Sequence, residues 1–314
     1  MSAGTDWLTA LCDQYRQHVD RRLPTTWTPL ARGMAVTMRA ARRNPPMAVG
    51  AGVVALVGLT AIVGPELVPH DPATQNAERS LQSPSLAHPM GTDQFGRDML
   101  SRVVHGARIS MGIAVAVTAI RVGLGTLIGV VAGAAGGWVD EALMRLVDIQ
   151  LAFPGLILAL IVAGVLGGSL RNLMLALAIV GWGSYARIVR GTVLTLSERT
   201  YVTAAGLYGT PRRRLFRRHF LPHVASPVLV VGTLNLGTVV LATAGLSFIG
   251  LGAQPPTPEW GTMIDNGQRY LVQASWLVNA PGIAIILTVL GFNLLGDGLR
   301  DRLDPQQQTR LEEV

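Results

Sequence analysis

Long apolar runs alternate with shorter polar intervals along this chain of 314 residues. Six runs carry few charges and approach the length of about 17–25 residues that a helix needs to cross a bilayer. The predicted spans are 47–68, 109–133, 149–165, 173–188, 224–249 and 276–295. The pattern therefore predicts an all-α polytopic membrane protein with six transmembrane helices.

The polar intervals are assigned to tails and loops. Residues 1–46 form a tail, 69–108 a loop after the first span, 109–303 the core, and 304–314 a second tail. Within the core, 136–148, 197–223 and 250–275 are expected to be loops. Apolar residues at helical spacing in the first tail predict amphipathic helices on the cytoplasmic membrane face, with partial disorder as the alternative. These residues are Trp7, Leu8, Leu11, Tyr15 and Val19.

The formal net charge of +7 comes from arginine, because the sequence contains no lysine. The arginines gather at the borders of the apolar runs, which favours contact with lipid headgroups over binding of nucleic acid. With six spans both termini lie on one side, and most arginines lie on that side, so the termini and 197–223 are expected to be cytoplasmic. Without lysine the chain cannot form a phosphate-binding loop ending in Gly-Lys-Ser/Thr.

Interval 197–223 is the most basic polar stretch of the core. A helix-compatible segment breaks at Gly209, and Thr210-Pro211 then provides an N-cap and a first-turn proline. Leu215, Phe216, His219 and Phe220 fall on one face of the second helix, and arginines cover much of the rest. A short helix of this kind suits a groove on another protein.

The order Ala-Ala, three residues, Gly, then a run ending in Leu-Pro resembles the coupling loop of ABC importer permeases. Thr203 occupies the position where that family has glutamate, so an ion pair made there would be absent or replaced. The resemblance implies that this stretch couples the chain to ATPase subunits. The residues implied are Thr203, Ala204, Ala205, Gly209, Leu215, Phe216, His219, Phe220, Leu221 and Pro222.

A second resemblance is longer and more specific. The stretch His88 to Asp98, HPMGTDQFGRD, is similar to that of the second permease of dipeptide, oligopeptide and nickel importers. Segments 254–261 and 296–301 match the same subfamily. The resemblance places the loop outside the membrane, near the docked binding protein. Its motif residues are Gly91, Thr92, Asp93, Gly96, Arg97 and Asp98.

Together these resemblances imply a type I ABC importer permease in the bacterial inner membrane. The implied partners are a homologous second permease, two ABC ATPases that bind ATP and Mg²⁺, an extracytoplasmic binding protein and membrane lipids. The chain itself would hold no cofactor or metal and would catalyse no reaction. Its implied function is import of dipeptides or oligopeptides, with nickel chelates as other substrates of the subfamily.

Three polar or aromatic residues inside the spans are candidates for the translocation pathway: Arg121, Trp182 and Asn235. A charge in mid-membrane is costly unless it faces protein or water. Arg121 therefore either meets an anionic group of the substrate or is a buried, paired structural residue. Trp260 and Trp276 are expected in the interfacial aromatic belt.

Two other classes of protein fit less well. A secondary transporter driven by ions or protons usually carries carboxylates or histidines within its spans, and here these residues lie in tails, loops and span ends. A metal-dependent intramembrane enzyme usually shows a His-Glu-x-x-His pair. His219 and His223 are four apart, but no acidic residue separates them.

Overall fold

The computed structural model of the chain describes residues 44–202, 214 and 220–303. The chain divides into two compact units, Met1–Pro45 and Pro46–Val314, and the described residues belong almost wholly to the second. The expected N-terminal amphipathic helices and most of the coupling stretch lie outside the described residues. The predicted coupling residues that lie outside the described ranges are Thr203, Ala204, Ala205, Gly209, Leu215, Phe216 and His219.

The regular elements of the described ranges are all helices, and the one isolated β-bridge there joins Thr92 and Asp98. Five segments are long and apolar enough to span a membrane, and a pair of helices bent by 89° makes a sixth if it is counted as one span. The five are α3 (Pro45–Leu67), α4 (Met99–Ala135), α7 with α8 (Leu170–Val180 and Gly183–Ser197), α11 (Leu221–Phe248) and α13 (Trp276–Leu303). The bent pair is α5 (Gly137–Ala152) with α6 (Gly155–Leu166). The predicted all-α membrane class is confirmed, with five or six apolar spans where six were expected.

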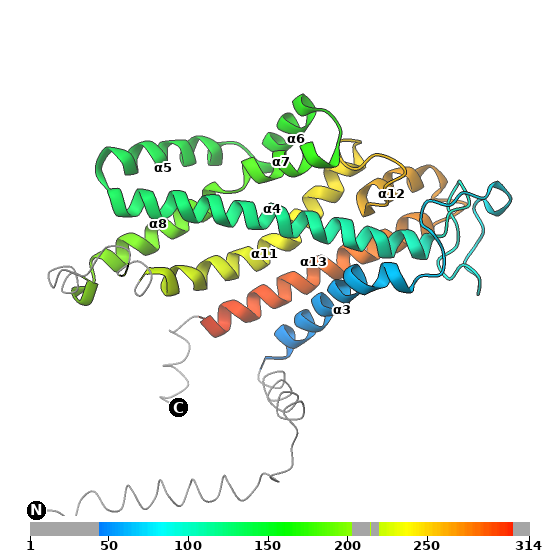
Figure 1. Cartoon of the computed structure of the whole chain (residues 1–314), viewed down its shortest axis with the longest axis horizontal. Coiled ribbons are helices and arrows are strands. Elements are labelled where there is room, and N and C mark those ends of the chain that lie inside the picture. Colours follow the sequence, from blue (N-terminus) through cyan, green and yellow to red (C-terminus); the bar gives the residue numbers. More distant parts are fainter. Residues whose placement is uncertain (1–43, 203–213, 215–219, 304–314) are drawn as a thin grey trace, which may run out of the picture. The chain divides into compact units, whose positions relative to one another are not determined.

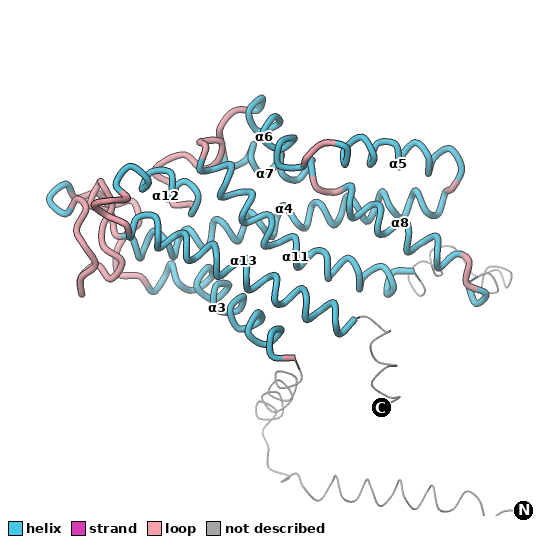
Figure 2. Tube along the Cα trace, turned by 180° about the vertical axis from the view of Figure 1, so that it is seen from behind, coloured by secondary structure: helices cyan, strands magenta, loops and turns pink. Residues whose placement is uncertain are grey.

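Helix α4 runs along α8 and also contacts α11, which in turn packs along α13 (Figures 1 and 2). Three short elements cluster at one end of these helices: η1 (Ala77–Arg79), α12 (Trp260–Gly267) and η3 (Gln268–Tyr270). One apolar core joins α4, α6, α7, α11, α12 and α13, and a second joins α8 to the start of α11.

The interval 136–148 was expected to be a loop, and this prediction is wrong. It belongs to α5, and the chain turns from α4 into α5 through Gly136 and Gly137, both with positive φ. The charged residues that suggested a loop are paired on helices: Asp140 with Arg190, Asp148 with Arg187, and Glu141 with Arg145. Span three is not straight either, because the helix axis turns by 89° at the Phe153-Pro154 break.

Other spans differ from their predicted limits. Helix α4 begins ten residues earlier than expected, at Met99, because Asp98 caps it by accepting a hydrogen bond from the Ser101 backbone N–H. The fourth span breaks at Gly181-Trp182 and then continues to Ser197. Helix α13 extends to Leu303, and the expected loop 250–275 contains α12.

Glycines at every fourth position of α4 allow α8 to approach closely. A Cβ atom added at Gly129 would lie 2.5 Å from the Ala186 carbonyl oxygen, and one at Gly125 or Gly133 would also overlap atoms of α8. Small residues at this spacing let helix backbones pack closely in membranes, where van der Waals contact drives association. The stripe thus fixes α4 against α8.

Candidate functional site

The stretch His88 to Asp98, in the loop before α4, forms a buried polar cluster around Asp93. Its Oδ1 atom accepts the backbone N–H groups of Phe95 (2.8 Å) and Arg97 (3.0 Å). Its Oδ2 atom pairs with Nε of Arg97 at 2.6 Å and lies 3.6 Å from Nε of Arg102. Arg102 also donates to the carbonyl oxygen of Pro72 (3.0 Å). Asp93 therefore organises its own turn and joins it to the first turn of α4.

Other motif residues also stabilise the fold of the loop before α4. Thr92 is fully buried, and its hydroxyl donates to the Arg79 carbonyl oxygen and accepts the Gln82 N–H (2.9 Å). Gly91 and Gly96 have φ of 72° and 70°, which only glycine adopts without strain. A Cβ at Gly96 would collide with the Asn76 carbonyl oxygen. All six predicted motif residues are thus brought together, and all six are buried.

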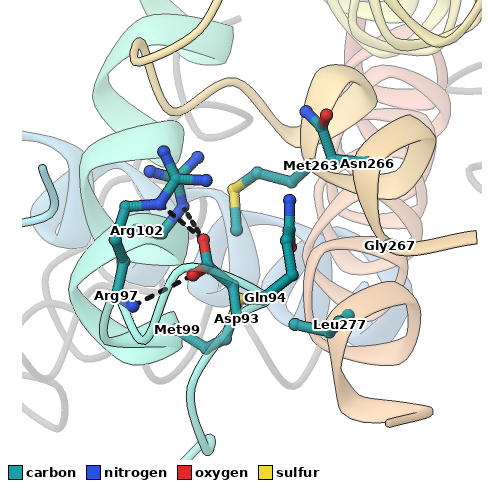
Figure 3. Close-up of a pocket in the computed structure, with 9 residues that line it drawn as sticks. All are labelled: Asp93, Gln94, Arg97, Met99, Arg102, Met263, Asn266, Gly267 and Leu277. Atoms are coloured by element: carbon teal, nitrogen blue, oxygen red, sulfur yellow. Dashed lines mark hydrogen bonds and ion pairs between the residues drawn. The ribbon is translucent and has the colours of Figure 1, made fainter. Parts of the chain in front are cut away.

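A small cavity beside this cluster is lined by Asp93, Gln94, Arg97, Arg102 and Asn266, among others (Figure 3). Its volume of about 10 Å³ is close to what one water molecule requires. Neither a peptide nor a metal chelate fits. The motif therefore builds the loop, and its buried residues do not form a substrate site.

The segment before α12 locks onto the same end of α4. Glu259, buried to 1% exposure, caps α12 at the Thr262 N–H (3.0 Å) and accepts the Ser110 hydroxyl of α4 (3.3 Å). Trp260 is also 1% exposed and donates its indole N–H to the Val103 carbonyl oxygen at 3.0 Å. Its expected place in an interfacial aromatic belt is therefore wrong. Trp276 is half-buried and donates to the Thr92 carbonyl oxygen (3.1 Å).

Arg121 is buried in α4, and its guanidinium caps the end of α7. Its Nε and Nη2 atoms donate to the Leu177 carbonyl oxygen at 2.8 and 2.6 Å. Leu177 lies in the last turn of α7, where carbonyls lack partners within the helix and a cation is favourable. Gly181 lies directly against the guanidinium, leaving no room for a Cβ atom. Arg121 is thus buried and hydrogen-bonded within the chain, as its structural alternative predicts.

Gln150 of α5 bridges the break between α7 and α8. Its Nε2 donates to the Ile179 carbonyl oxygen (2.5 Å), and its Oε1 accepts the Gly183 N–H (2.8 Å). An irregular backbone within a span is tolerated when side chains satisfy the freed polar groups. The sequence reasoning missed Gln150, although an amide between Ile149 and Leu151 in an apolar run was a usable signal.

Helix α5 is held along α8 by two further contacts. The Asp140 carboxylate forms a bidentate pair with Arg190, with Oδ2 2.6 Å from Nη2. The more exposed Asp148 lies 2.6 Å from Arg187. Because the partners run in opposite order along the two helices, α5 and α8 are antiparallel.

A cavity of about 460 Å³ lies between α6, α7 and α11, with Arg121 as its charged residue. Apolar side chains such as Leu156, Leu177 and Leu241 supply most of its wall, and Thr238 adds a hydroxyl. Of the three predicted pathway residues, only Arg121 lines it. Trp182 lies at the break between α7 and α8. Asn235 lies close to the Tyr185 hydroxyl without meeting hydrogen-bond geometry.

The two ends of the segment 203–219 meet at one apolar cluster. Val202 before it and Phe220 after it are both buried there, with Tyr185 and Val189 of α8 and Val224 of α11. The adjacent Leu221 and Pro222 are exposed and begin α11, where a first-turn proline is favourable.

Comparison with known proteins decides the family. Residues 125–308 match the family model of the binding-protein-dependent transport system inner membrane component. The chain belongs to this family. Residues 34–84 match a second family model, the N-terminal transmembrane domain of oligopeptide transport permease C. The chain is thus an inner-membrane permease component of an ABC importer, as its sequence predicted.

Individual members of the permease family are similar over most of the chain. A dipeptide transport system permease of Alkalihalophilus pseudofirmus is 42% identical over 85% of this chain and 88% of its own length. A probable D,D-dipeptide transport system permease of Escherichia coli is 43% identical over 84% of this chain and 88% of its own length. A nickel transport system permease of Escherichia coli is 40% identical over 82% of this chain and 93% of its own length.

Proposed function

We propose that this permease carries dipeptides or short peptides across the inner membrane as half of a heteromeric translocation pathway. The observation that carries the proposal is the similarity to dipeptide permeases at 42–43% identity over more than four fifths of the chain. The nickel relative at 40% supplies the competing substrate class. The chain itself lacks lysine and hence a phosphate-binding loop, so partner ATPases bind ATP and Mg²⁺ and hydrolyse the nucleotide.

The coupling contact is proposed for the basic stretch 197–223, which joins α8 to α11. The excess of arginine near this stretch and the termini supports a cytoplasmic location for all three. Thr203, Ala204, Ala205 and Gly209 are the expected contacts of its first half. Leu215, Phe216 and His219 would supply the apolar face of its second half, which Phe220, Leu221 and Pro222 join to α11.

On the opposite side, the loop 69–98 and the segment 250–261 are proposed to receive the binding protein. Because the motif residues are buried, their role there is to shape the surface, and exposed neighbours such as Leu86 and Phe95 would make contact. Alternating access would follow when the ATPases close and draw the two permeases' coupling segments together.

The test is reconstitution of the chain in proteoliposomes with the partner permease, the ATPases and the binding protein from the same genome. ATP-dependent uptake of a labelled dipeptide is measured with Gly209→Arg as the uncoupled variant. We expect uptake that requires ATP and that Gly209→Arg abolishes. Uptake of Ni²⁺ chelates in place of dipeptide would overturn the substrate, and a chain that binds no ATPase would overturn the coupling assignment.

A further inference from the structure

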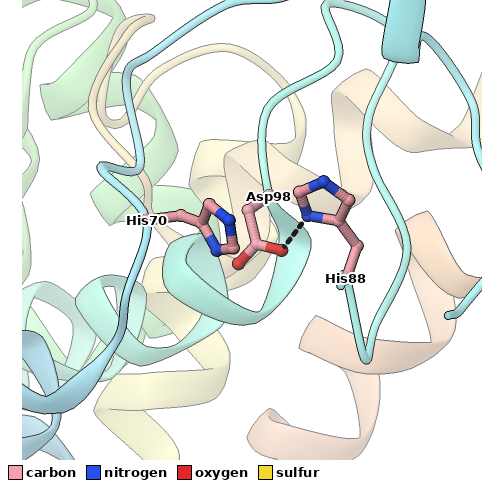
Figure 4. Close-up of side chains that lie close together, drawn as sticks. All are labelled: His70, His88 and Asp98. Carbon is pink, nitrogen blue, oxygen red and sulfur yellow. Dashed lines mark hydrogen bonds and ion pairs between the residues drawn. The ribbon is translucent and has the colours of Figure 1, made fainter. Parts of the chain in front are cut away.

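Three potential metal ligands, far apart in the sequence, meet at the base of the loop before α4. They are His70, shortly after α3; His88, in the loop; and Asp98, the N-cap of α4. Their ligand atoms all lie within 4.8 Å of one another. Figure 4 shows the Asp98 carboxylate between the two imidazole rings.

Two of the three ligands are already fixed. His88 and Asp98 are each 4% exposed, and Nδ1 of His88 lies 2.8 Å from Oδ1 of Asp98. The second carboxylate oxygen accepts the Ser101 N–H at 2.8 Å, which holds the carboxylate plane. These contacts hold the His88 imidazole and the Asp98 carboxylate side by side.

His70 has no part in this structural pair. Its ring stands 4.8 Å from the His88 ring, centre to centre, at 39°. No hydrogen bond to its side chain is found among the described residues, and it is only half-buried. The pair of His88 and Asp98 explains the cap of α4, but it leaves unexplained why a second imidazole faces the same carboxylate.

We propose that His70, His88 and Asp98 bind one divalent transition-metal ion of the zinc class. Imidazole and carboxylate together suit Zn²⁺, whereas Mg²⁺ and Ca²⁺ take oxygen ligands. Tetrahedral Zn²⁺ with bonds of about 2.0–2.1 Å places neighbouring ligand atoms about 3.3 Å apart. His70, the exposed member, can close the remaining distance by rotating its side chain, and water would fill the fourth position.

The ion would have a structural role. It would join the end of α3, the middle of the loop and the start of α4, which are otherwise connected by 27 intervening residues between His70 and Asp98. The site shares no residue with the 460 Å³ cavity, so we expect metal binding without the transported substrate.

The experiment measures metal binding to the full chain in lipid nanodiscs, purified with a tag that contains no histidine. Co²⁺ is the spectroscopic probe and Zn²⁺ the competitor. We expect one Co²⁺ per chain with the visible absorption of a four-coordinate site, displaced by Zn²⁺ and unaffected by Mg²⁺. Zn²⁺ should also raise the unfolding temperature.

Three variants separate this site from other histidines. His70→Ala removes a proposed metal ligand. Loss of an outer-shell partner already lowers metal affinity by about 10–100-fold, so we expect His70→Ala to weaken Co²⁺ binding by at least that factor. Asp98→Asn keeps an N-cap residue and should weaken binding while preserving the fold. His105→Ala is the matched control, because His105 lies on α4 outside the cluster and its ring hydrogen-bonds the Ser101 carbonyl oxygen of the same helix. Wild-type binding that is absent, or equal in His70→Ala and His105→Ala, would overturn the proposal.

Discussion

Arg121 on α4 donates two hydrogen bonds to a single backbone oxygen, that of Leu177 on α7, at 2.8 and 2.6 Å. The cation thereby closes a helix that ends inside the membrane domain. The same side chain borders the 460 Å³ cavity. Arg121 therefore caps α7 just before the break between α7 and α8 and also gives the cavity wall a positive charge.

Replacement of Arg121 by lysine should destabilise the permease, because a single ammonium group cannot reproduce the two-atom contact with Leu177. We expect a loss of about 1.5–3 kcal/mol, the range for hydrogen bonds to charged groups. Thermal unfolding in nanodiscs measures the loss, and dipeptide uptake is followed in parallel. An unchanged unfolding temperature combined with a raised KM would instead assign Arg121 to substrate contact.

Replacement of Gly129 by alanine should disrupt the contact of α4 with α8, since the new Cβ would lie 2.5 Å from the Ala186 carbonyl oxygen. Overpacking of this kind costs about 1–3 kcal/mol. Gly123→Ala is the control on the same helix, because nothing lies within 4 Å of its added Cβ. Equal yield and unfolding temperature for the two variants would refute the close approach.

The two ion pairs between α5 and α8 should differ in strength. Asp140 and Arg190 are partly buried and bidentate, while Asp148 and Arg187 have side chains 62% and 55% exposed. We expect the exposed pair to contribute about 0.2–1 kcal/mol and to weaken with salt. Double-mutant cycles should give a larger, less salt-sensitive coupling energy for Asp140 with Arg190, and the reverse order would contradict the geometry.

Phe220→Ala should uncouple transport from ATP hydrolysis, because it removes a buried anchor where the basic stretch joins α11. Truncation of a buried phenylalanine lowers the free energy of unfolding by about 3–5 kcal/mol. Here we expect the loss to weaken the packing where the basic stretch joins α11. The measurement is uptake per ATP hydrolysed in proteoliposomes. The control Leu229→Ala, on the same helix at a side chain 58% exposed, should keep the wild-type ratio. A normal ratio in Phe220→Ala would show that the anchor is dispensable.

The apolar runs alone predicted the long apolar helices, since membrane helices must satisfy their own backbone and bury long apolar stretches. They failed at 136–148, where the charges of Asp140 and Asp148 suggested a loop. Their partners, Arg190 and Arg187, lie about 40–50 positions later, so only tertiary contact shows that the interval is helical.

Motif resemblance found the loop before α4 but not the role of its residues. Asp93 and Thr92 are buried structural groups, and no local pattern distinguishes these from exposed contact residues. The glycines at 125, 129 and 133 and the amide of Gln150 were visible in the sequence, yet their meaning depends on the helix that faces them.

The shared burial of Val202 and Phe220 has a mechanical consequence. A segment attached at both ends to one apolar cluster delivers any displacement to α8 and α11 at the same point and at the same time. The two helices therefore cannot be pulled in opposite senses by their common connection. We expect a displacement that enters there to move the end of α8 and the start of α11 as one unit.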